Sequence, residues 1–287
     1  MIKENAYAKI NISLDVTAAR SDGYHDMLMV MQSISIHDEI EIETEPSGKI
    51  SAECNFDFIP GDERNLAVKA AKLYFERLGK YGQGAKIRIN KKIPVGAGMA
   101  GGSSDAAAVL RALNRAFDGP FKKEELLELA ARTGSDVPFC LIGGTALAEG
   151  RGERLTELNN MPDCDILVAK PEFSISTPEF FRAIDRIKLR THPDTKGICE
   201  AVSAGSLPDI ARRMYNVFED IPDRRLREVS EIRSRMLDEG ALGAIMTGTG
   251  SAVFAVFEKG KASLALREEL KNKYGFCELA GPVGRQI

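Results

Sequence analysis

A glycine-rich segment at residues 94–108, PVGAGMAGGSSDAAA, carries the clearest chemical signal in the chain. Its glycines and serines stand directly before a run of helix-forming residues; they are Gly96, Gly98, Gly101, Gly102, Ser103 and Ser104. Glycine tolerates positive φ angles and lets a ligand approach the backbone. We expect Ser103 or Ser104 to cap the helix that follows. A glycine loop that leads into a helix N-terminus presents free N–H groups, so the segment predicts a phosphate site.

Better-known phosphate loops do not match this segment. Gly96, Gly98 and Gly101 have the spacing of a dinucleotide-binding loop, but that fold needs a second strand with an acidic residue at its end about 20 residues on. Here Asp118 ends a predicted helix, and another helix follows. A P-loop needs a lysine that is absent between Gly96 and Ser104, and the H-R-D and D-F-G motifs of protein kinases are absent too. The structural alternative is a tight glycine turn that packs a strand on a helix.

Asp136 and Lys9 are candidates for acid–base and charge-stabilising chemistry. Asp136 precedes Val137-Pro138, a pattern typical of a short helix, which we expect Ser135 to cap. Its carboxylate suits a general base, but an acid in a first helical turn can also simply complement the helix dipole. Lys9 lies on the polar face of a predicted strand, where lysines are usually solvated. Asn11 follows on the same face, roughly 6.5–7 Å along the strand.

The first half of the chain is predicted to combine strands and helices around these residues. Residues 7–16 alternate, with apolar side chains on one face (Ala8, Ile10, Ile12, Leu14, Val16) and polar ones on the other (Tyr7, Lys9, Asn11, Ser13, Asp15). After a turn at 20–26 we expect strands at 34–43, 50–52, 85–90 and 143–148. Helices are predicted at 65–78, 104–117 and 123–133.

The turn-rich sequence NNMPD at residues 159–163 predicts a division into two domains, residues 1–159 and residues 160–287. Beyond it we expect a strand at 165–169 and a helix opened by a capping box, Ser176 to Glu179. Further helices are predicted at 209–215, 225–239 and 261–274, with a loop and a strand within 240–257. Strands and helices do not alternate as in a doubly wound sheet, so the pattern indicates the α+β class.

Composition excludes several classes of function. The chain has 287 residues, is 44% hydrophobic and carries a net charge of −3, which argues against nucleic acid or a charged membrane as a partner. The polar start MIKENAYAK is no signal peptide, and no apolar run approaches the roughly 20 residues of a membrane span. Five scattered cysteines (Cys54, Cys140, Cys164, Cys199, Cys277) are typical of free thiols in a reducing cytoplasm. Three histidines without ligand spacing predict no protein metal site. We expect a cytoplasmic protein with a small-molecule ligand, and the sequence specifies no oligomeric state.

Segments spread over nearly the whole chain resemble the GHMP kinase superfamily, which includes galactokinase, homoserine kinase and the mevalonate and phosphomevalonate kinases. PVGAGMAGGSSDAAAVL is similar to its second motif, and MTGTGSAVFAVF at residues 246–257 to its third. AKINISLDVTAARSDGYHDM and GSDVPFCLIGGTALAEGRGE resemble one branch, whose members use ATP to phosphorylate the 2-hydroxyl of CDP-linked methylerythritol in the non-mevalonate route to isoprenoid precursors. The DGYH element, Asp22 to His25, is specific to that branch. One departure is Met99-Ala100, where members usually have Leu-Gly.

The resemblance implies a two-lobed α+β fold with ATP and substrate in the cleft between the lobes. The N-terminal lobe would resemble ribosomal protein S5 domain 2, and the C-terminal lobe would be ferredoxin-like. ATP, with Mg²⁺ on its phosphates, would lie near Asn65 in a cradle formed by Pro94, Val95, Gly96, Ala97, Gly98, Met99, Ala100, Gly101, Gly102, Ser103 and Ser104. A methyl group at Ala100 removes no backbone donor from that cradle.

The resemblance also assigns catalytic roles. Asp136 would be the general base that takes the proton of the attacking hydroxyl. Lys9 would stabilise the developing negative charge, and Asn11 would hydrogen-bond the hydroxyls of the substrate. A different kinase of the superfamily, of the homoserine or mevalonate type, is one alternative function. A nucleotide-binding regulator that has lost catalysis is another.

Recognition of cytidine would depend on aromatic residues from two segments. Tyr24 and Phe181 would sandwich the pyrimidine, and His25 would hydrogen-bond its edge. Phe181 next to Phe180 could equally belong to a helix core. Thr249, between two glycines, would contact the methylerythritol phosphates through backbone amides, or it could form a turn into a strand.

Overall fold

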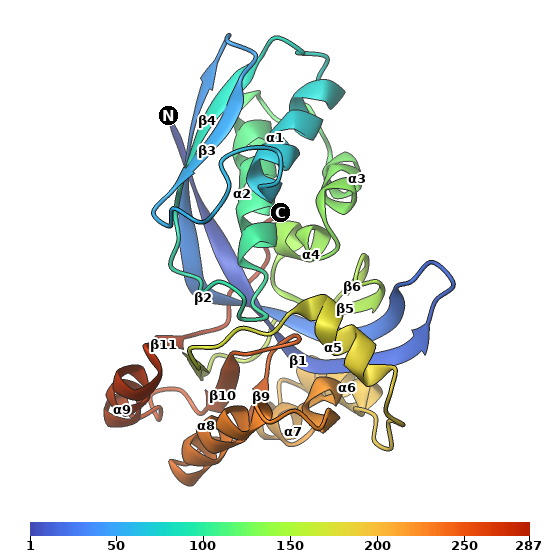
Figure 1. Ribbon diagram of the computed structural model, residues 1–287, viewed down its shortest axis with the longest axis vertical. Helices are drawn as coiled ribbons and strands as arrows, with labels where there is room; N and C mark the ends of the chain where they lie inside the picture. Colours follow the sequence, from blue (N-terminus) through green and yellow to red (C-terminus); the bar gives the residue numbers. More distant parts are fainter.

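The computed structural model describes residues 1–287 and contains two β-sheets with helices packed against them (Figure 1). The larger sheet has seven strands, most of them from the first half of the chain: β1 (Ile2–Ala19), β2 (His25–Glu45), β3 (Ile50–Cys54), β4 (Gly84–Asn90), β5 (Thr145–Gly150), β6 (Arg154–Glu157) and β8 (Tyr215–Asn216). Its order is β3-β4-β2-β1-β8, with β5 on β2 and β6 on β5. This mixture of strands and helices confirms the predicted α+β class.

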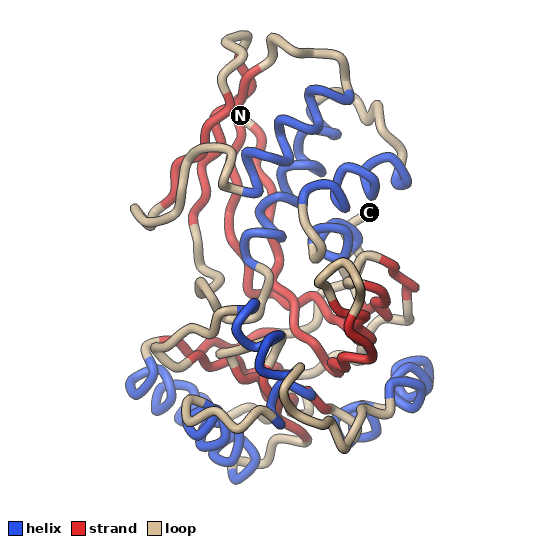
Figure 2. The backbone as a smooth tube through the Cα atoms, turned by 45° about the vertical axis from the view of Figure 1, so that its right-hand side comes forward, coloured by secondary structure: helices blue, strands red, loops and turns tan.

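The helices of the first half lie together on one side of the larger sheet (Figures 1 and 2). They are α1 (Leu66–Arg77), α2 (Gly101–Ala116), α3 (Lys123–Thr133) and α4 (Val137–Ile142). The central helix is α2, which packs against α1, α4 and β1. Its buried alanines, Ala106 to Ala108, let these elements approach closely and hold the start of α2 in a fixed place.

The smaller sheet has four antiparallel strands in the order β11-β7-β10-β9: β7 (Asp165–Lys170), β9 (Gly243–Met246), β10 (Val253–Phe257) and β11 (Phe276–Ala280). Numbered along the chain, this is the 4-1-3-2 order of a ferredoxin-like sheet. The helices of this half are α5 (Thr177–Ile184), α6 (Thr195–Ala204), α7 (Leu207–Arg212), α8 (Leu226–Asp238) and α9 (Leu264–Tyr274), with a short 3-10 helix at Val217–Asp220. The expected ferredoxin-like lobe is therefore present.

Several predicted boundaries in the second half were wrong. The helix α6 and the strand β11 were not predicted, and the predicted helix at 209–215 ends at Arg212, since Tyr215 lies in β8. Ser176 stands at the N-terminus of α5, but its side chain makes no capping hydrogen bond. The capping box does not form because the Glu179 carboxylate instead accepts a 2.5 Å hydrogen bond from Arg225.

The predicted alternation of β1 holds only in part. The pairing register between β1 and β2 shifts at Tyr7/Ala8 and again at Asn11/Ser13. At the second shift Ile12 has no partner on β2, and one extra residue exchanges the two faces of the strand from there on. Ala8, Ile10 and Ile12 therefore pack in one core cluster, whereas Leu14 joins Ala6 in the other. The prediction that Lys9, Asn11, Ser13 and Asp15 share one face was wrong beyond Asn11.

The two halves of the chain are joined by more than one connection. β8 pairs in parallel with β1 at Ser13 and Leu14. The C-terminal tail returns to the first half, where Val283 N donates to Ser33 O (2.9 Å) and Gln286 N to Ile142 O (2.7 Å). Figure 1 shows the C-terminus beside the helices of the first half. The division at 159/160 stays a prediction, and the tail crosses it.

Apolar side chains from both sheets form the core between the lobes. Ile10 and Ile12 of β1 pack in one cluster with Ile166 and Val168 of β7 and with Phe254 of β10. This shared core fixes the polar side chains of β1 relative to the third motif, which lies between β9 and β10. No helix in the structure combines the length and the apolar character needed to cross a membrane.

Candidate active site

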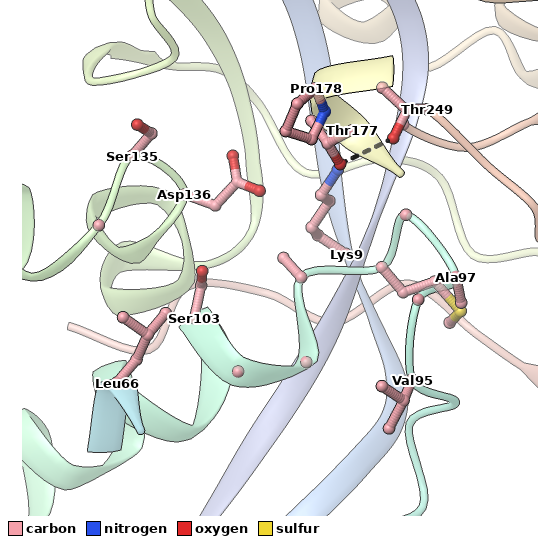
Figure 3. Close-up of a pocket in the computed structure, with 18 of the residues that line it drawn as sticks. Lys9, Leu66, Val95, Ala97, Ser103, Ser135, Asp136, Thr177, Pro178 and Thr249 are labelled. Atoms are coloured by element: carbon pink, nitrogen blue, oxygen red, sulfur yellow. Dashed lines mark hydrogen bonds between the residues drawn. The ribbon is translucent and has the colours of Figure 1, made fainter. Parts of the chain in front are cut away.

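A cavity of about 860 Å³ lies where the two halves meet, and its lining includes residues of both. Lys9, Asp136 and the glycine loop come from the first half, and Phe181 and Thr249 come from the second. Figure 3 shows Lys9, Asp136, Ser103 and Thr249 around one space. The volume is typical of a site for a small molecule. The cavity is lined by the glycine loop at one end and by aromatic side chains at the other.

The glycine loop owes its shape to positive φ angles and to the third motif behind it. Gly98 has φ +76°, and a Cβ there would collide with the carbonyl oxygen of Thr247. Only glycine fits this contact, which joins the loop to the segment between β9 and β10. Met99 O accepts a hydrogen bond from Lys9 N (3.2 Å), so the loop is also fixed to β1.

The helix α2 begins at Gly101, earlier than predicted, and the residue at its N-cap is Ala100. The prediction that Ser103 or Ser104 caps the helix was wrong, because both serines lie inside its first turn. Ala100 has φ +56°, a left-handed conformation that costs a residue with a Cβ about 1–2 kcal/mol. The backbone N–H groups at this helix start have no side-chain cap and remain available for an anion.

Lys9 and Asp136 line the same cavity, as their predicted roles require. Lys9 is only 5% exposed, and its Nζ donates a 2.6 Å hydrogen bond to Asn11 Oδ1 without pairing with any acid. Asp136, rather than the predicted Ser135, is the N-cap residue of α4, and its carboxylate makes no capping hydrogen bond. A buried ammonium without an acid partner and an unengaged carboxylate thus face one space, which suits a reacting hydroxyl between them (Figure 3).

Cys140 is buried close to Lys9 and Asp136, and the charges of both residues influence the pKa of its thiol. Burial raises the pKa of its thiol to about 12, and the negative charge of Asp136 adds to this effect. The positive charge of Lys9 acts in the opposite direction. A thiol with this pKa stays protonated, so Cys140 is unsuited to act as a nucleophile.

The aromatic end is assembled from the β1–β2 hairpin and α5. Tyr24 is 53% exposed and lines the cavity. The ring of Phe181 stacks on His25, with 4.8 Å between centroids and 28° between planes. His25 Nε2 lies 2.7 Å from Asp185 Oδ1. Phe180, by contrast, is fully buried, so the cavity-facing phenylalanine of α5 is Phe181.

Known proteins resemble this chain over nearly its full length. Residues 65–144 match the family described as GHMP kinases N terminal domain, and residues 198–275 match GHMP kinases C terminal. The chain is 42% identical to 4-diphosphocytidyl-2-C-methyl-D-erythritol kinase of Clostridium beijerinckii over 273 residues, which cover 95% of this chain and 97% of that protein. It is also 42% identical to the kinase of the same name from Caldicellulosiruptor saccharolyticus, with 93% and 91% covered.

A crystal structure of a 4-(cytidine 5'-diphospho)-2C-methyl-D-erythritol kinase aligns with a TM-score of 0.82 at 33% identity, covering 99% of this chain and 100% of that one. The chain belongs to the 4-diphosphocytidyl-2-C-methyl-D-erythritol kinase family. It is therefore a GHMP kinase, and membership implies the use of ATP. Homoserine kinase from Cytophaga hutchinsonii shares the fold, with a TM-score of 0.76 at 18% identity and 99% and 95% covered. The predicted family and two-lobed fold are confirmed.

Within this family fold, Ser104 and Asn65, both predicted to lie at the nucleotide, also make hydrogen bonds to other parts of the chain. Ser104 is buried and does not line the cavity, because its Oγ donates to the carbonyl oxygen of Tyr7 (2.7 Å). Ser103, one position earlier on α2, does line it. Asn65 lines the cavity too, but its amide is engaged: Oδ1 accepts from Ala67 N (3.0 Å) and Nδ2 donates to Pro60 O (2.9 Å). Asn65 is the N-cap of α1 and orients this wall.

Asn11 and Thr249 connect the reacting end to the third motif. Asn11 Oδ1 accepts from Lys9 Nζ and from Gly248 N (3.1 Å), so this buried amide positions the lysine. Thr249 Oγ1 lies 3.1 Å from Thr177 Oγ1 at the start of α5, and both residues line the cavity (Figure 3). The hydroxyl pair links the third motif to the helix that carries Phe181.

A buried ionic cluster that was not predicted from the sequence lies beneath the glycine loop. Lys91 Nζ lies 2.5 Å from Asp38 Oδ2 and 2.9 Å from Asp105 Oδ2, and all three side chains are buried. Asp105 Oδ1 has no hydrogen-bond partner. Burial raises the pKa of Asp105 to about 8, although Lys91 acts to lower it. The one available signal was Lys91, directly after the strand β4 and before the glycine loop; its partners Asp38 and Asp105 lie far away in sequence.

Proposed function

We propose that the chain transfers the terminal phosphoryl group of ATP to the 2-hydroxyl of 4-diphosphocytidyl-2-C-methyl-D-erythritol, in the non-mevalonate synthesis of isoprenoid precursors. The observation that carries this proposal is a single cavity lined by the glycine loop, by Lys9 and Asp136, and by Tyr24, His25 and Phe181. The curated relatives with 42% identity carry the name of this kinase. A nucleotide at one end and a cytidine at the other would bring their reacting groups together near Lys9.

The nucleotide half of the site fits a triphosphate. Backbone N–H groups of the loop and of the uncapped start of α2 would bind the phosphate oxygens, and the Ser103 hydroxyl lines the same wall. A Cβ at Gly98 would break the contact that fixes the loop to Thr247. Mg²⁺ bound with the nucleotide would neutralise part of the phosphate charge.

Asp136 and Lys9 carry out the chemical step. Asp136 accepts the proton of the 2-hydroxyl as its oxygen forms a bond to the γ-phosphorus, and the bond to the leaving oxygen of ADP breaks. Lys9, held by Asn11, stabilises the negative charge on the attacking oxygen and the transferred group. General-base assistance typically contributes about 10²–10⁴ in rate, so positioning and charge stabilisation supply the rest.

Cytidine would bind at the aromatic end. Tyr24 and Phe181 provide faces for stacking, and base–aromatic stacking contributes about 1–3 kcal/mol per base in nucleic-acid complexes. His25, fixed by Asp185, would hydrogen-bond the pyrimidine edge. Thr249 would contact the methylerythritol part through the third motif. The proposed location is the reducing cytoplasm, on the pattern of scattered cysteines.

The test is an assay of ADP release with ATP, Mg²⁺ and a panel of acceptors. We expect turnover with 4-diphosphocytidyl-2-C-methyl-D-erythritol and none above background with homoserine or mevalonate. Turnover on homoserine or mevalonate alone would favour a different GHMP kinase. ATP binding without turnover on any acceptor would favour a regulator and contradict the proposal.

A further inference from the structure

The turn between β5 and β6 runs along the cavity wall between the reacting end and the aromatic end. On one side, a Cβ at Gly152 would lie 3.9 Å from Asp136 Oδ1 and 3.2 Å from Met29 Cε. On the other side, the guanidinium carbon of Arg151 lies 4.9 Å from the centroid of the Tyr24 ring. Two consecutive residues thus reach from the proposed general base to the proposed nucleobase wall.

Arg151 is a cation without an anionic partner at this position. It lines the cavity at an exposed position and takes part in no ion pair, whereas the half-buried Arg225 binds both Glu179 and Asp223. The pKa of Asp22 is lowered mainly by its hydrogen bonds from Arg20 and slightly by the charge of Arg151. The Asp22 carboxylate is therefore already bound by Arg20 and is not a partner of Arg151. Glu153 accepts a hydrogen bond from the backbone N–H of Arg151 rather than from its guanidinium.

The backbone of the turn keeps this guanidinium beside the site. Gly152 is buried and has φ +106°, which a residue with a Cβ rarely adopts. The turn can therefore pack directly against Met29 and Asp136. The Tyr24 ring under the guanidinium restricts its position further, because a cation above an aromatic face is attracted to it.

The proposed substrate carries a diphosphate between its cytidine and its methylerythritol. With the 2-hydroxyl at Asp136 and the pyrimidine at Tyr24, this diphosphate would span the wall between them, which the 150–153 turn lines. We propose that the Arg151 guanidinium binds the diphosphate of the acceptor substrate, and so selects a diphosphate-linked nucleoside over a free nucleoside. This inference rests on the proposed function. Guanidinium is suited to the role because its forked donors match phosphate oxygens.

The experiment compares the binding of CDP and of cytidine by calorimetry, with the ATP site filled by a non-hydrolysable ATP analogue. In Arg151→Gln we expect the Kd for CDP to rise about tenfold and the Kd for cytidine to change less than about twofold, as loss of a charge-assisted hydrogen bond predicts. Arg151→Lys, which keeps the charge, should restore part of the CDP affinity. The matched control is Arg154→Gln, three residues along at an exposed position outside the cavity, where both Kd values should stay unchanged.

Steady-state kinetics give a second readout. Arg151→Gln should raise KM for the diphosphocytidyl substrate about tenfold and leave KM for ATP unchanged. Equal losses for CDP and cytidine would show that Arg151 acts only by orienting Tyr24, and unchanged CDP binding would show no role; either result overturns the inference. If the wild-type protein phosphorylates the substrate while Arg151→Gln is unaffected, only this inference fails. If the wild type neither binds CDP nor turns over the substrate, the proposed function fails with it.

Discussion

The phosphate end and the aromatic end of the cavity are built in opposite ways. The phosphate end is one continuous segment, residues 94–103, whose chemistry comes from backbone N–H groups and the start of α2. The aromatic end collects side chains from three distant segments: the β1–β2 hairpin, the β5–β6 turn and α5. A change at the first end should therefore act through backbone geometry, and a change at the second through the loss of one side-chain contact.

The residue with the largest expected effect lies between the two ends. Asp136→Asn keeps the shape of the side chain and removes its ability to accept a proton, so kcat should fall at least about 100-fold. KM values for both substrates should change much less, because neither end is altered. The measurement is ADP release under saturating substrates, with thermal unfolding as the control for folding. Wild-type turnover in this variant would refute the assignment of the base.

A backbone change at the phosphate end should follow in size. Gly98→Ala places a methyl group against the carbonyl oxygen of Thr247 and strains a backbone with φ +76°. We expect KM for ATP to rise by about tenfold or more, since overpacking costs about 1–3 kcal/mol, while KM for the cytidine substrate stays close to that of the wild type. The control is Gly119→Ala, where φ is +67° but no atom lies within 4 Å of the new Cβ. Equal changes in both KM values would contradict the separation of the two ends.

A side-chain deletion at the aromatic end should show the converse pattern. Phe181→Ala removes one stacking face and should raise KM for the cytidine substrate about tenfold, within the 1–3 kcal/mol of base stacking, with KM for ATP unchanged. Phe58→Ala is the control, because that phenylalanine is 69% exposed and does not line this cavity. An unchanged KM in Phe181→Ala would place the stacking partner elsewhere.

The smallest effect on activity is expected beneath the phosphate end, where a buried carboxyl group instead changes the pH dependence of stability. Burial raises the pKa of Asp105 to about 8, so the folded protein keeps a proton that the unfolded chain releases near pH 4. The folded state binds more protons between these values, and the free energy of unfolding therefore decreases as pH rises toward 8. Asp105→Asn removes this term, and its stability relative to wild type should increase by about 2 kcal/mol between pH 6 and pH 8 in urea unfolding. Parallel stabilities of the two proteins over this range would contradict the shifted titration.

Local sequence predicted the elements around the phosphate end well. The glycines and the alanine-rich helix formers gave the loop and α2, and the predicted helix at 123–133 matches α3. The helix starts were less well predicted, because Ser104 and Ser176 have the residue type of a cap but make other contacts or none. Capping depends on where the neighbouring chain lies, which the local sequence does not specify.

The sequence by itself determined the chemical groups: a glycine loop before a helix, a carboxylate at a short helix, a lysine in a strand, and the DGYH element whose resemblance indicated the family. Tertiary structure alone decided which of them meet. The bulge at Ile12 turns Leu14 away from the apolar side predicted for it. The pairing of Asp38 and Asp105 with Lys91 joins β2, α2 and the residue that follows β4. Arg151 reaches Tyr24 only because β5 pairs with β2. Register and packing set these contacts through interactions between distant residues, whereas the properties that the sequence conveys directly are local ones.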